Sequence, residues 1–191
     1  MKRPVYLVLG AIVAIILVWL GLRSGGGEQT AVDLIAQFPS ATTKKPTPEC
    51  FSVTDATIAG QSMKAILVKD PAQDTGLAGS RLVYSLTVPE HARLKGNLAI
   101  LEKGWTVPGD GVLFRVLLAP SNLPPEEILN MPIDPYGNPK DRVCHDFDLD
   151  LSEYAGETVE LFFNTNSSLP ARPPDHNGDL AVWGALRVVT K

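Results

Sequence analysis

The chain has 191 residues, of which 45% are hydrophobic and 20% are charged, and its formal net charge is −4. Lys2, Arg3 and Arg23 are the only charged residues among the first 23, so residues 24–191 carry 14 basic and 21 acidic side chains. This acidic balance argues against nucleic acid and against anionic lipid headgroups as the main partner. Sixteen prolines and sixteen glycines favour a loop-rich β domain over a helical bundle.

The first feature along the chain is an uncharged hydrophobic run at residues 4–22, PVYLVLGAIVAIILVWLGL. As a helix it would be about 28 Å long, close to the ~30 Å hydrocarbon core of a bilayer. Lys2 and Arg3 precede it, which predicts a cytoplasmic N-terminus and an extracytoplasmic remainder. A cleaved signal peptide is the alternative, but the run is long for one and no A-x-A-like cleavage site follows. We therefore expect residues 1–23 to be a signal anchor of a single-pass protein of the cell inner membrane, with a periplasmic C-terminal domain.

Residues 24–49 are predicted to form a linker that contains one short amphipathic helix at 30–38. Ile35 and Phe38 fall on one face of this helix, and Pro39 ends it. The apolar face can lie on the membrane surface, on the folded domain or on a partner protein.

From residue 50 onward the pattern is typical of strands separated by turns. The segment at 145–151, HDFDLDL, alternates strictly, and 81–89, RLVYSLTVP, has the same period. Eight or so such strands predict one all-β sandwich or barrel over residues 50–191. A stretch at 121–142 contains five prolines, and we expect it to be a long irregular loop.

The two cysteines, Cys50 and Cys144, are not part of a C-x-x-C motif. In an extracytoplasmic compartment they can form one disulfide. Two separate buried thiols are the equal alternative.

Three stretches in order, GWTVPGDGVLFRV at 104–116, FDLDLSEYAGETVELFFNT at 147–165 and DLAVWGALRVV at 179–189, resemble the galactose-binding-domain-like jelly roll. Membrane-associated modules akin to carbohydrate-binding modules share this pattern. The matching positions are Asp110, Gly111, Val112, Phe114, Asp150, Leu151, Ser152, Tyr154, Ala155, Gly156 and Trp183. The resemblance implies a jelly-roll β-sandwich over about three quarters of the chain, and it says little about the ligand because one fold carries many functions.

Most of the matched residues are expected to maintain the fold. Gly156 supplies an unusual backbone conformation, the hydroxyl of Tyr154 bonds to the backbone, and Asp150 caps the turn amides. Trp183 lies on an apolar strand and is expected in the core rather than as a platform for a sugar.

The segment at 175–179, DHNGD, is a weak candidate for a structural calcium site of the kind that related jelly rolls hold. Asp175, Asn177 and Asp179 would supply the oxygen ligands. A plain surface turn is the alternative, and no other cofactor is expected.

The sequence gives no sign of an enzyme. Asp146, Asp148 and Asp150 would lie on one face of one strand, which is usual for a solvated face and not for a pair of catalytic carboxylates. The main hypothesis is a non-catalytic accessory or structural subunit of a larger membrane protein complex, for which a respiratory or photosynthetic assembly is one candidate host. The alternative is a carbohydrate-binding module tethered at the cell surface.

Partner contacts are expected in the proline-rich stretch, through Ile128, Met131 and Tyr136, with Ile35 and Phe38 of the 30–38 helix assisting. The stretch has more apolar side chains than a solvated loop needs. They can instead fold back over one open end of the sandwich. The domain has few tryptophans free to stack on a sugar, which favours a protein partner over carbohydrate.

Overall fold

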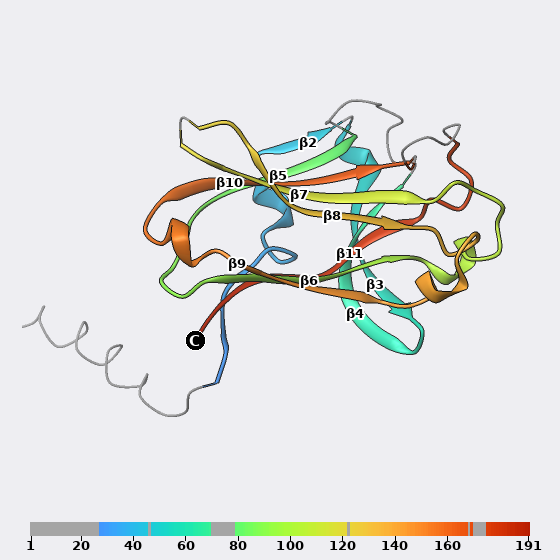
Figure 1. Cartoon of the computed structure of the whole chain (residues 1–191), viewed down its shortest axis with the longest axis horizontal. Helices are drawn as coiled ribbons and strands as arrows, with labels where there is room; N and C mark the ends of the chain where they lie inside the picture. Colours follow the sequence, from blue (N-terminus) through green and yellow to red (C-terminus); the bar gives the residue numbers. More distant parts are fainter. Residues whose placement is uncertain (1–26, 46, 70–78, 122, 168, 170–174) are drawn as a thin grey trace, which may run out of the picture.

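The structure is a computed structural model that describes residues 27–45, 47–69, 79–121, 123–167, 169 and 175–191. In these residues it is a sandwich of two antiparallel β-sheets (Figure 1). The predicted signal anchor at 1–23 lies outside the described residues. Within the described ranges no helix is long and apolar enough to cross a membrane.

The first sheet has the strand order β3-β4-β11-β6-β9, and β1 adds to it by pairing with β11. Its strands are β1 (Gln29–Asp33), β3 (Phe51–Ile58), β4 (Gln61–Val68), β6 (Arg93–Ile100), β9 (His145–Asp150) and β11 (Ala181–Thr190). The second sheet has the order β2-β5-β10-β7-β8. Its strands are β2 (Thr43–Lys45), β5 (Ser80–Thr87), β7 (Val112–Pro120), β8 (Glu126–Ile133) and β10 (Thr158–Asn166).

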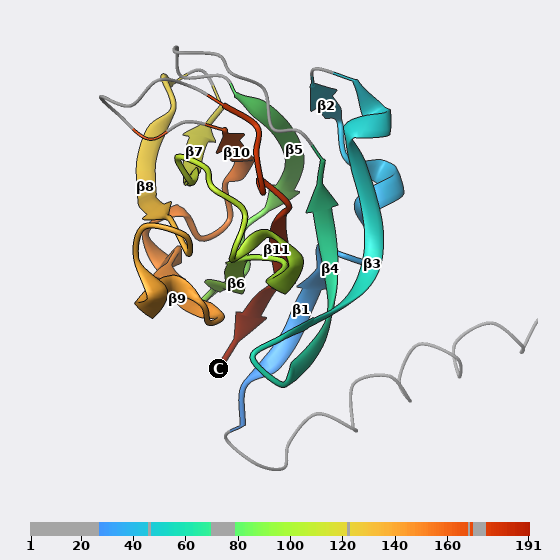
Figure 2. The ribbon, with the colours of Figure 1, turned by 90° about the vertical axis from the view of Figure 1, so that its right-hand side faces the viewer.

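From β4 to β11 the chain changes sheets at each connection except the β7–β8 hairpin, as expected for a jelly roll. Short 3₁₀ turns lie in the connections: η1 (Phe38–Ser40), η2 (Pro48–Cys50), η3 (Glu102–Gly104), η4 (Pro139–Asp141) and η5 (Ser152–Tyr154). The start of β1 lies beside the C-terminus, because Gln29 pairs with Thr190 (Figure 2). The prediction of an all-β sandwich is confirmed.

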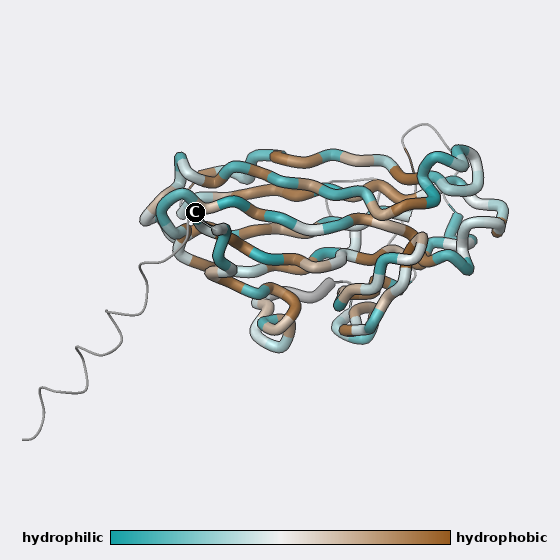
Figure 3. The backbone as a smooth tube through the Cα atoms, turned by 90° about the horizontal axis from the view of Figure 1, so that it is seen from below, coloured by the Kyte–Doolittle hydropathy of each residue, from teal (hydrophilic) through white to brown (hydrophobic). Residues whose placement is uncertain are grey.

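The core forms between the sheets because apolar and polar residues alternate along the strands (Figure 3). Trp183 of β11 lies at its centre and is 1% exposed. The rings of Phe114, Phe147 and Phe163 meet it edge-to-face, with centroid distances of 5.2, 6.3 and 5.1 Å. Its indole N–H donates to Thr165 Oγ1 at 2.9 Å, so the one polar atom of the ring is satisfied. The prediction that Trp183 belongs to the core is confirmed.

The predicted helix at 30–38 is wrong, because this segment begins as strand β1 and continues as a turn. The side chain of Asp33 accepts hydrogen bonds from the backbone N–H groups of Ile35 and Ala36, each at 3.0 Å. Leu34 is fully buried, and its carbonyl accepts the hydroxyl of Tyr84 at 2.8 Å. So short a helix is marginal on its own, whereas β11 offers a strand edge. The segment therefore belongs to the sandwich rather than to a linker.

The prediction of an irregular loop at 121–142 is also wrong, because the stretch contains the edge strand β8. β8 pairs with β7 so that Met131 lies opposite Phe114 and Leu129 opposite Val116. Pro132 is tolerated because an edge strand needs hydrogen bonds on one side only. The proline count indicated a loop, but the alternation of apolar residues decided the structure.

The turn around residues 150–156 is as predicted except for the tyrosine. Asp150 Oδ1 accepts the backbone N–H of Ser152 at 2.9 Å, and Gly156 has φ +83°. The hydroxyl of Tyr154, however, donates to the carboxylate of Glu126 at 3.2 Å and not to the backbone. The turn is thereby connected to the start of β8.

The prediction of a disulfide between the two cysteines is wrong, because both thiols are free. Cys50 immediately precedes β3, whereas Cys144 Sγ lies 4.0 Å from the carbonyl oxygen of Ile58 at the other end of that strand. An eight-residue strand separates the two ends by about 25 Å at ~3.3 Å per residue. A disulfide needs Cα atoms within about 7 Å.

Two free thiols give a direct chemical prediction. Protein purified without reductant and then denatured should react with two equivalents of a maleimide per chain, as measured by intact mass. Cys50→Ser should react with one. Zero equivalents for the parent protein would contradict the separation of the cysteines across β3.

Candidate functional site

A β-bulge in β11 shapes the outer face of the first sheet. The pairing of β11 with β6 changes register between Gly184 and Arg187, so that Ala185 and Leu186 together oppose Gly96. Ala185 has φ +46°, a conformation that costs a non-glycine residue on the order of 1–3 kcal/mol. A Cβ atom at Gly96 would lie 2.7 Å from Leu186 Cδ2, so this position needs glycine. Such bulges change the direction of side chains, and this one precedes Arg187.

Two strands share one edge of β11 on either side of this bulge. β4 pairs with Ala181–Gly184, and β1 pairs with residues 187–190. Neither strand pairs with Ala185, and a hollow of about 520 Å³ remains beside the bulge. We call it the apolar hollow; it is lined by Thr30, Asp33, Ile35, Ala36, Val53, Met63, Lys64, Ala185, Leu186 and Arg187.

A second hollow of about 350 Å³ lies on the other side of Arg187, over β6 and β9. We call it the polar hollow; it is lined by Lys95, Gly96, Asn97, Asp146, Phe147, Asp148 and Arg187. Antiparallel pairing places Asn97 opposite Asp146 and Lys95 opposite Asp148. The strand register therefore brings these polar side chains to one face.

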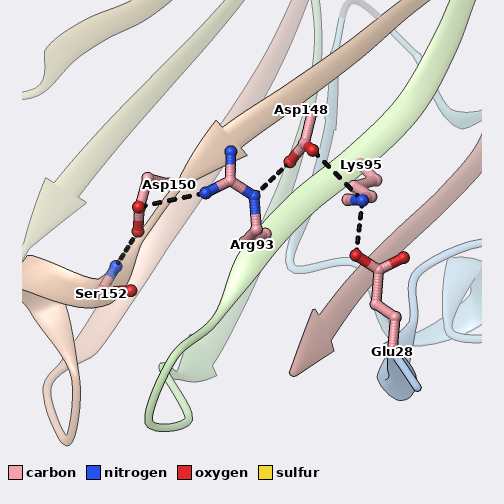
Figure 4. Close-up of polar contacts among 6 residues, drawn as sticks. All are labelled: Glu28, Arg93, Lys95, Asp148, Asp150 and Ser152. Carbon is pink, nitrogen blue, oxygen red and sulfur yellow. Dashed lines mark hydrogen bonds and ion pairs between the residues drawn. The ribbon is translucent and has the colours of Figure 1, made fainter. Parts of the chain in front are cut away.

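A chain of ion pairs, which we call the charge ladder, borders the polar hollow (Figure 4). Lys95 Nζ lies 2.5 Å from Glu28 Oε1 and 3.1 Å from Asp148 Oδ2. Arg93 continues the ladder, with Nε 2.6 Å from Asp148 Oδ1 and Nη1 3.1 Å from Asp150 Oδ2. Both oxygens of Asp148 are thus engaged, which fixes one wall of the polar hollow.

The ladder changes the pKa values of its members. Burial favours a higher pKa for Asp148, but the hydrogen bonds from Arg93 and Lys95 outweigh it and lower the pKa below the ordinary value. The pKa of Asp150 is lowered by its hydrogen bonds with Ser152 and by Arg93. The pKa of Lys95 is raised by Glu28 and Asp148. Lys95, Asp148 and Asp150 therefore stay charged over a wider pH range than isolated groups of their kind.

Three other side chains of the polar hollow keep unused hydrogen-bonding capacity. The amide of Asn97 donates to Asp146 Oδ1, and Arg187 Nη1 donates to the carbonyl of Ala185 at 2.8 Å. Within the part of the chain that the structure describes, Arg187 has no carboxylate partner and Asp146 has no cationic partner. The polar hollow therefore offers guanidinium donors, carboxylate acceptors and an amide to a ligand.

Of the five residues predicted to contact a partner, one is buried in the core and three are partly buried against it. Ile35 is 7% exposed, and Ile128, Met131 and Phe38 are partly buried against the main hydrophobic cluster. Tyr136 alone of this set is well exposed, at 48%. A partner contact through these residues stays a prediction, and Tyr136 is its most accessible member.

The residues of the suggested calcium site form a turn. Asp175 Oδ1 accepts the backbone N–H of Asn177 at 2.8 Å, and Asp179 is 3% exposed. Burial and the charge of Asp175 raise the pKa of the neighbouring Asp110. Across the described residues, no group of three or more His, Cys, Asp or Glu side chains is placed to hold a metal ion. The calcium site stays a prediction without support from this geometry.

The sequence interpretation missed Asn97, Asp146 and Arg187. Asp146 is predicted on a solvated strand face, and no role is predicted for Asn97 or Arg187. The alternation of Arg93, Lys95 and Asn97 in β6 is the signal that could have identified the face, because it is complementary to the aspartates of β9.

No protein-family model matches the chain. A protein of Archaeoglobus fulgidus described as "Uncharacterized protein" is 36% identical over 128 residues. The match covers 66% of this chain, and this chain spans only 31% of that relative.

Solved structures with a related arrangement of strands include carbohydrate-binding modules. The M60 catalytic domain with the CBM51-1 and CBM51-2 domains from Clostridium perfringens ZmpB has a TM-score of 0.46 and 14% identity, covering 87% of this chain and 14% of that chain. The CBM22-1 xylan-binding domain from Paenibacillus barcinonensis Xyn10C has a TM-score of 0.43 and 11% identity, covering 78% and 85%. The module CBM6cm-2 from Cellvibrio mixtus lichenase 5A, solved with cellotriose, has a TM-score of 0.38 and 10% identity, covering 86% and 97%. At these scores the likeness does not extend to a ligand or a site.

The charge ladder predicts a specific pH dependence of stability. Because the pKa of Asp148 is lowered on folding, its contribution is present above the unfolded value of about 3.9 and is lost as the pH falls through the folded pKa. Asp148→Asn should therefore lower the melting temperature at pH 6, and the difference from the parent protein should shrink toward pH 3 and in 1 M salt. Glu160→Gln, at an exposed position on the second sheet, is the control and should show little difference. A difference independent of pH would contradict the role of the ion pairs.

The packing of Met131 against the core predicts effects of different size for two residues of the proline-rich stretch. Met131→Ser should lower the free energy of unfolding by about 2 kcal/mol, because a side chain packed on the core is removed. Tyr136→Ser should change it by less than about 0.5 kcal/mol, since its side chain is exposed. Denaturant unfolding measures both values. Equal effects would contradict the placement of Met131 against the core.

Proposed function

We propose that this chain is a non-catalytic carbohydrate-binding module, held on the extracytoplasmic side of the inner membrane by the hydrophobic segment at 1–23. The observation that carries the proposal is the unused hydrogen-bonding capacity of Asn97, Asp146 and Arg187 around the polar hollow. The proposed localisation is supported by the basic residues before the uncharged run at 4–22.

The chemistry of the three side chains suits a sugar. Each sugar hydroxyl donates one hydrogen bond and accepts others, so its site needs both kinds of group close together. Arg187 supplies donors, Asp146 supplies acceptors and the amide of Asn97 supplies both. The volume of about 350 Å³ is within the usual range of small-molecule sites, which begins at about 300 Å³.

The position of the site also suits recognition. Its side chains come from strands of one sheet, which hold them more rigidly than a loop would. Lys95 and Asp148 are fixed by the charge ladder, so little side-chain entropy is lost when a ligand binds beside them.

The proposal that the module is non-catalytic rests on the state of its carboxylates. Hydrolysis of a glycoside needs one carboxylic acid with a raised pKa beside a second carboxylate. Asp148 lies nearest to Asp146 along β9, but Arg93 and Lys95 hold its pKa below the ordinary value. Asp148 is therefore unsuited to donate a proton near neutral pH.

The accessory-subunit hypothesis depended on apolar side chains in an exposed loop. Ile128 and Met131 instead pack against the core, so that basis is weaker. Tyr136 keeps an exposed ring, and the partner hypothesis now depends on it.

A panel of methyl glycosides of glucose, galactose, mannose and N-acetylglucosamine tests the proposal. With the full chain in lipid nanodiscs, ligand-observed NMR should show saturable binding of at least one of them. Asp146→Ala and Arg187→Ala should each weaken binding by about tenfold, the effect of losing roughly 1.4 kcal/mol of hydrogen bonding. Glu160→Ala is the matched control and should bind as the parent does. Absence of binding to all four, or unchanged binding in both site variants, would contradict the proposal.

A further inference from the structure

The apolar and polar hollows are neighbours across Gly184 and Arg187. Arg187 lines both of them. A Cβ atom at Gly184 would lie 2.3 Å from Met63 Sδ in the apolar hollow and 3.4 Å from Asn97 Cβ in the polar hollow. The space that a side chain at Gly184 would take is therefore filled by the thioether of Met63, whose flexible end separates the apolar hollow from the polar hollow.

Two polar residues that line the apolar hollow, Asp33 and Lys64, are already engaged. Asp33 Oδ1 accepts the backbone N–H groups of Ile35 and Ala36. Lys64 Nζ pairs with Asp55 at 2.8 Å. Apart from Thr30 and Arg187, the rest of the lining is aliphatic or thioether, and Val53 is 44% exposed on the edge strand β3. An occupant would therefore gain by burying apolar surface rather than by forming hydrogen bonds.

Arg187 determines what can join the two hollows. Arg187 lines both hollows, and its one hydrogen bond within the described residues is from Nη1 to the Ala185 carbonyl. A ligand that passes Arg187 should present oxygen acceptors there, as a glycosidic or phosphate linkage does.

We infer that the ligand is an amphipathic glycoside, of the glycolipid kind, with its sugar in the polar hollow and its alkyl group in the apolar hollow. This inference rests on the proposed function and adds the class of aglycone. It accounts for two adjoining hollows of opposite character, which a free sugar would use only in part.

Matched methyl and n-hexyl glycosides of the same four sugars test the inference. Both series are water-soluble, and empty nanodiscs correct for partition of the hexyl compounds into lipid. The hexyl glycoside should bind the full chain at least about tenfold more tightly than its methyl counterpart, because several methylenes are buried at ~0.8 kcal/mol each.

Two variants assign this gain to the apolar hollow. Val53→Asp places a charge on its exposed wall, and Gly184→Ala places a methyl group against the thioether of Met63, which lines the apolar hollow, so that Met63 must move. Both should reduce the hexyl advantage to less than about threefold while methyl glycoside affinity is kept. Met63 has a flexible end, so Gly184→Ala should fold, and an unchanged melting temperature confirms this for each variant.

The outcomes separate the two proposals. Binding of neither series would overturn the carbohydrate-binding function itself. Equal affinity for methyl and hexyl glycosides would keep that function and overturn this inference. A hexyl advantage that persists in Val53→Asp would also overturn it. Equal affinities together with a dimer that Val53→Asp dissociates, measured by analytical ultracentrifugation, would assign the apolar hollow to a second copy of the chain.

Discussion

The bulge at Ala185 and Leu186 is the constraint on which the outer face of the first sheet depends. An unbroken β11 would let one continuous neighbour strand pair along its edge. The bulge instead ends the pairing of β4 at Gly184, and β1 begins its pairing at Arg187. The apolar hollow opens between these two strands. Ala185 keeps its positive φ because the surrounding structure fixes the backbone there. β11 is paired on both sides of the bulge, Leu186 packs in the core, and Gly96 leaves the space that Leu186 occupies.

The charge ladder and the polar hollow show how the same residue types take two roles. Asp148 and Asp146 are two residues apart on β9 and face the same side. Asp148 has both oxygens engaged by Arg93 and Lys95, so it contributes to order on the sheet rather than to recognition. Asp146 pairs only with an amide, so its carboxyl group keeps hydrogen-bonding capacity for a ligand. The difference comes from the register of β6, which places cations opposite one aspartate and Asn97 opposite the other.

Residue patterns predicted the sandwich well where one period dominated. The alternation in 145–151 predicts β9 and the residues that it buries. The apolar run around Trp183 predicts β11 and the place of Trp183 in the core. Prediction failed where two local signals competed. Five prolines concealed the alternation of β8, and the helical spacing of Ile35 and Phe38 before Pro39 concealed β1. The polar hollow could not be predicted, because Arg187 meets Asn97 and Asp146 only through pairings between strands far apart in sequence. The bulge at Ala185 could not be predicted from residue type, because alanine rarely adopts a positive φ.

The outer face of the first sheet has a half that is covered by a connecting segment and a half that is open to solvent. Beyond Gly184, the residues that face outward are apolar: Ala56, Ile58, Ala65, Leu67, Ala99 and Val182 form a second buried cluster. The segment around η3 covers them, and the indole of Trp105 is fixed there by donating to the carbonyl of Ile100 at 2.8 Å. Arg142 donates in turn to the Trp105 carbonyl at 3.3 Å. On the half of the face near Arg93, the outward residues of β6 and β9 are charged. Because this half exposes little apolar surface, it needs no covering segment. The apolar hollow lies at this boundary, and that position explains why it combines a largely apolar lining with access from solvent and with a neighbouring site for polar groups.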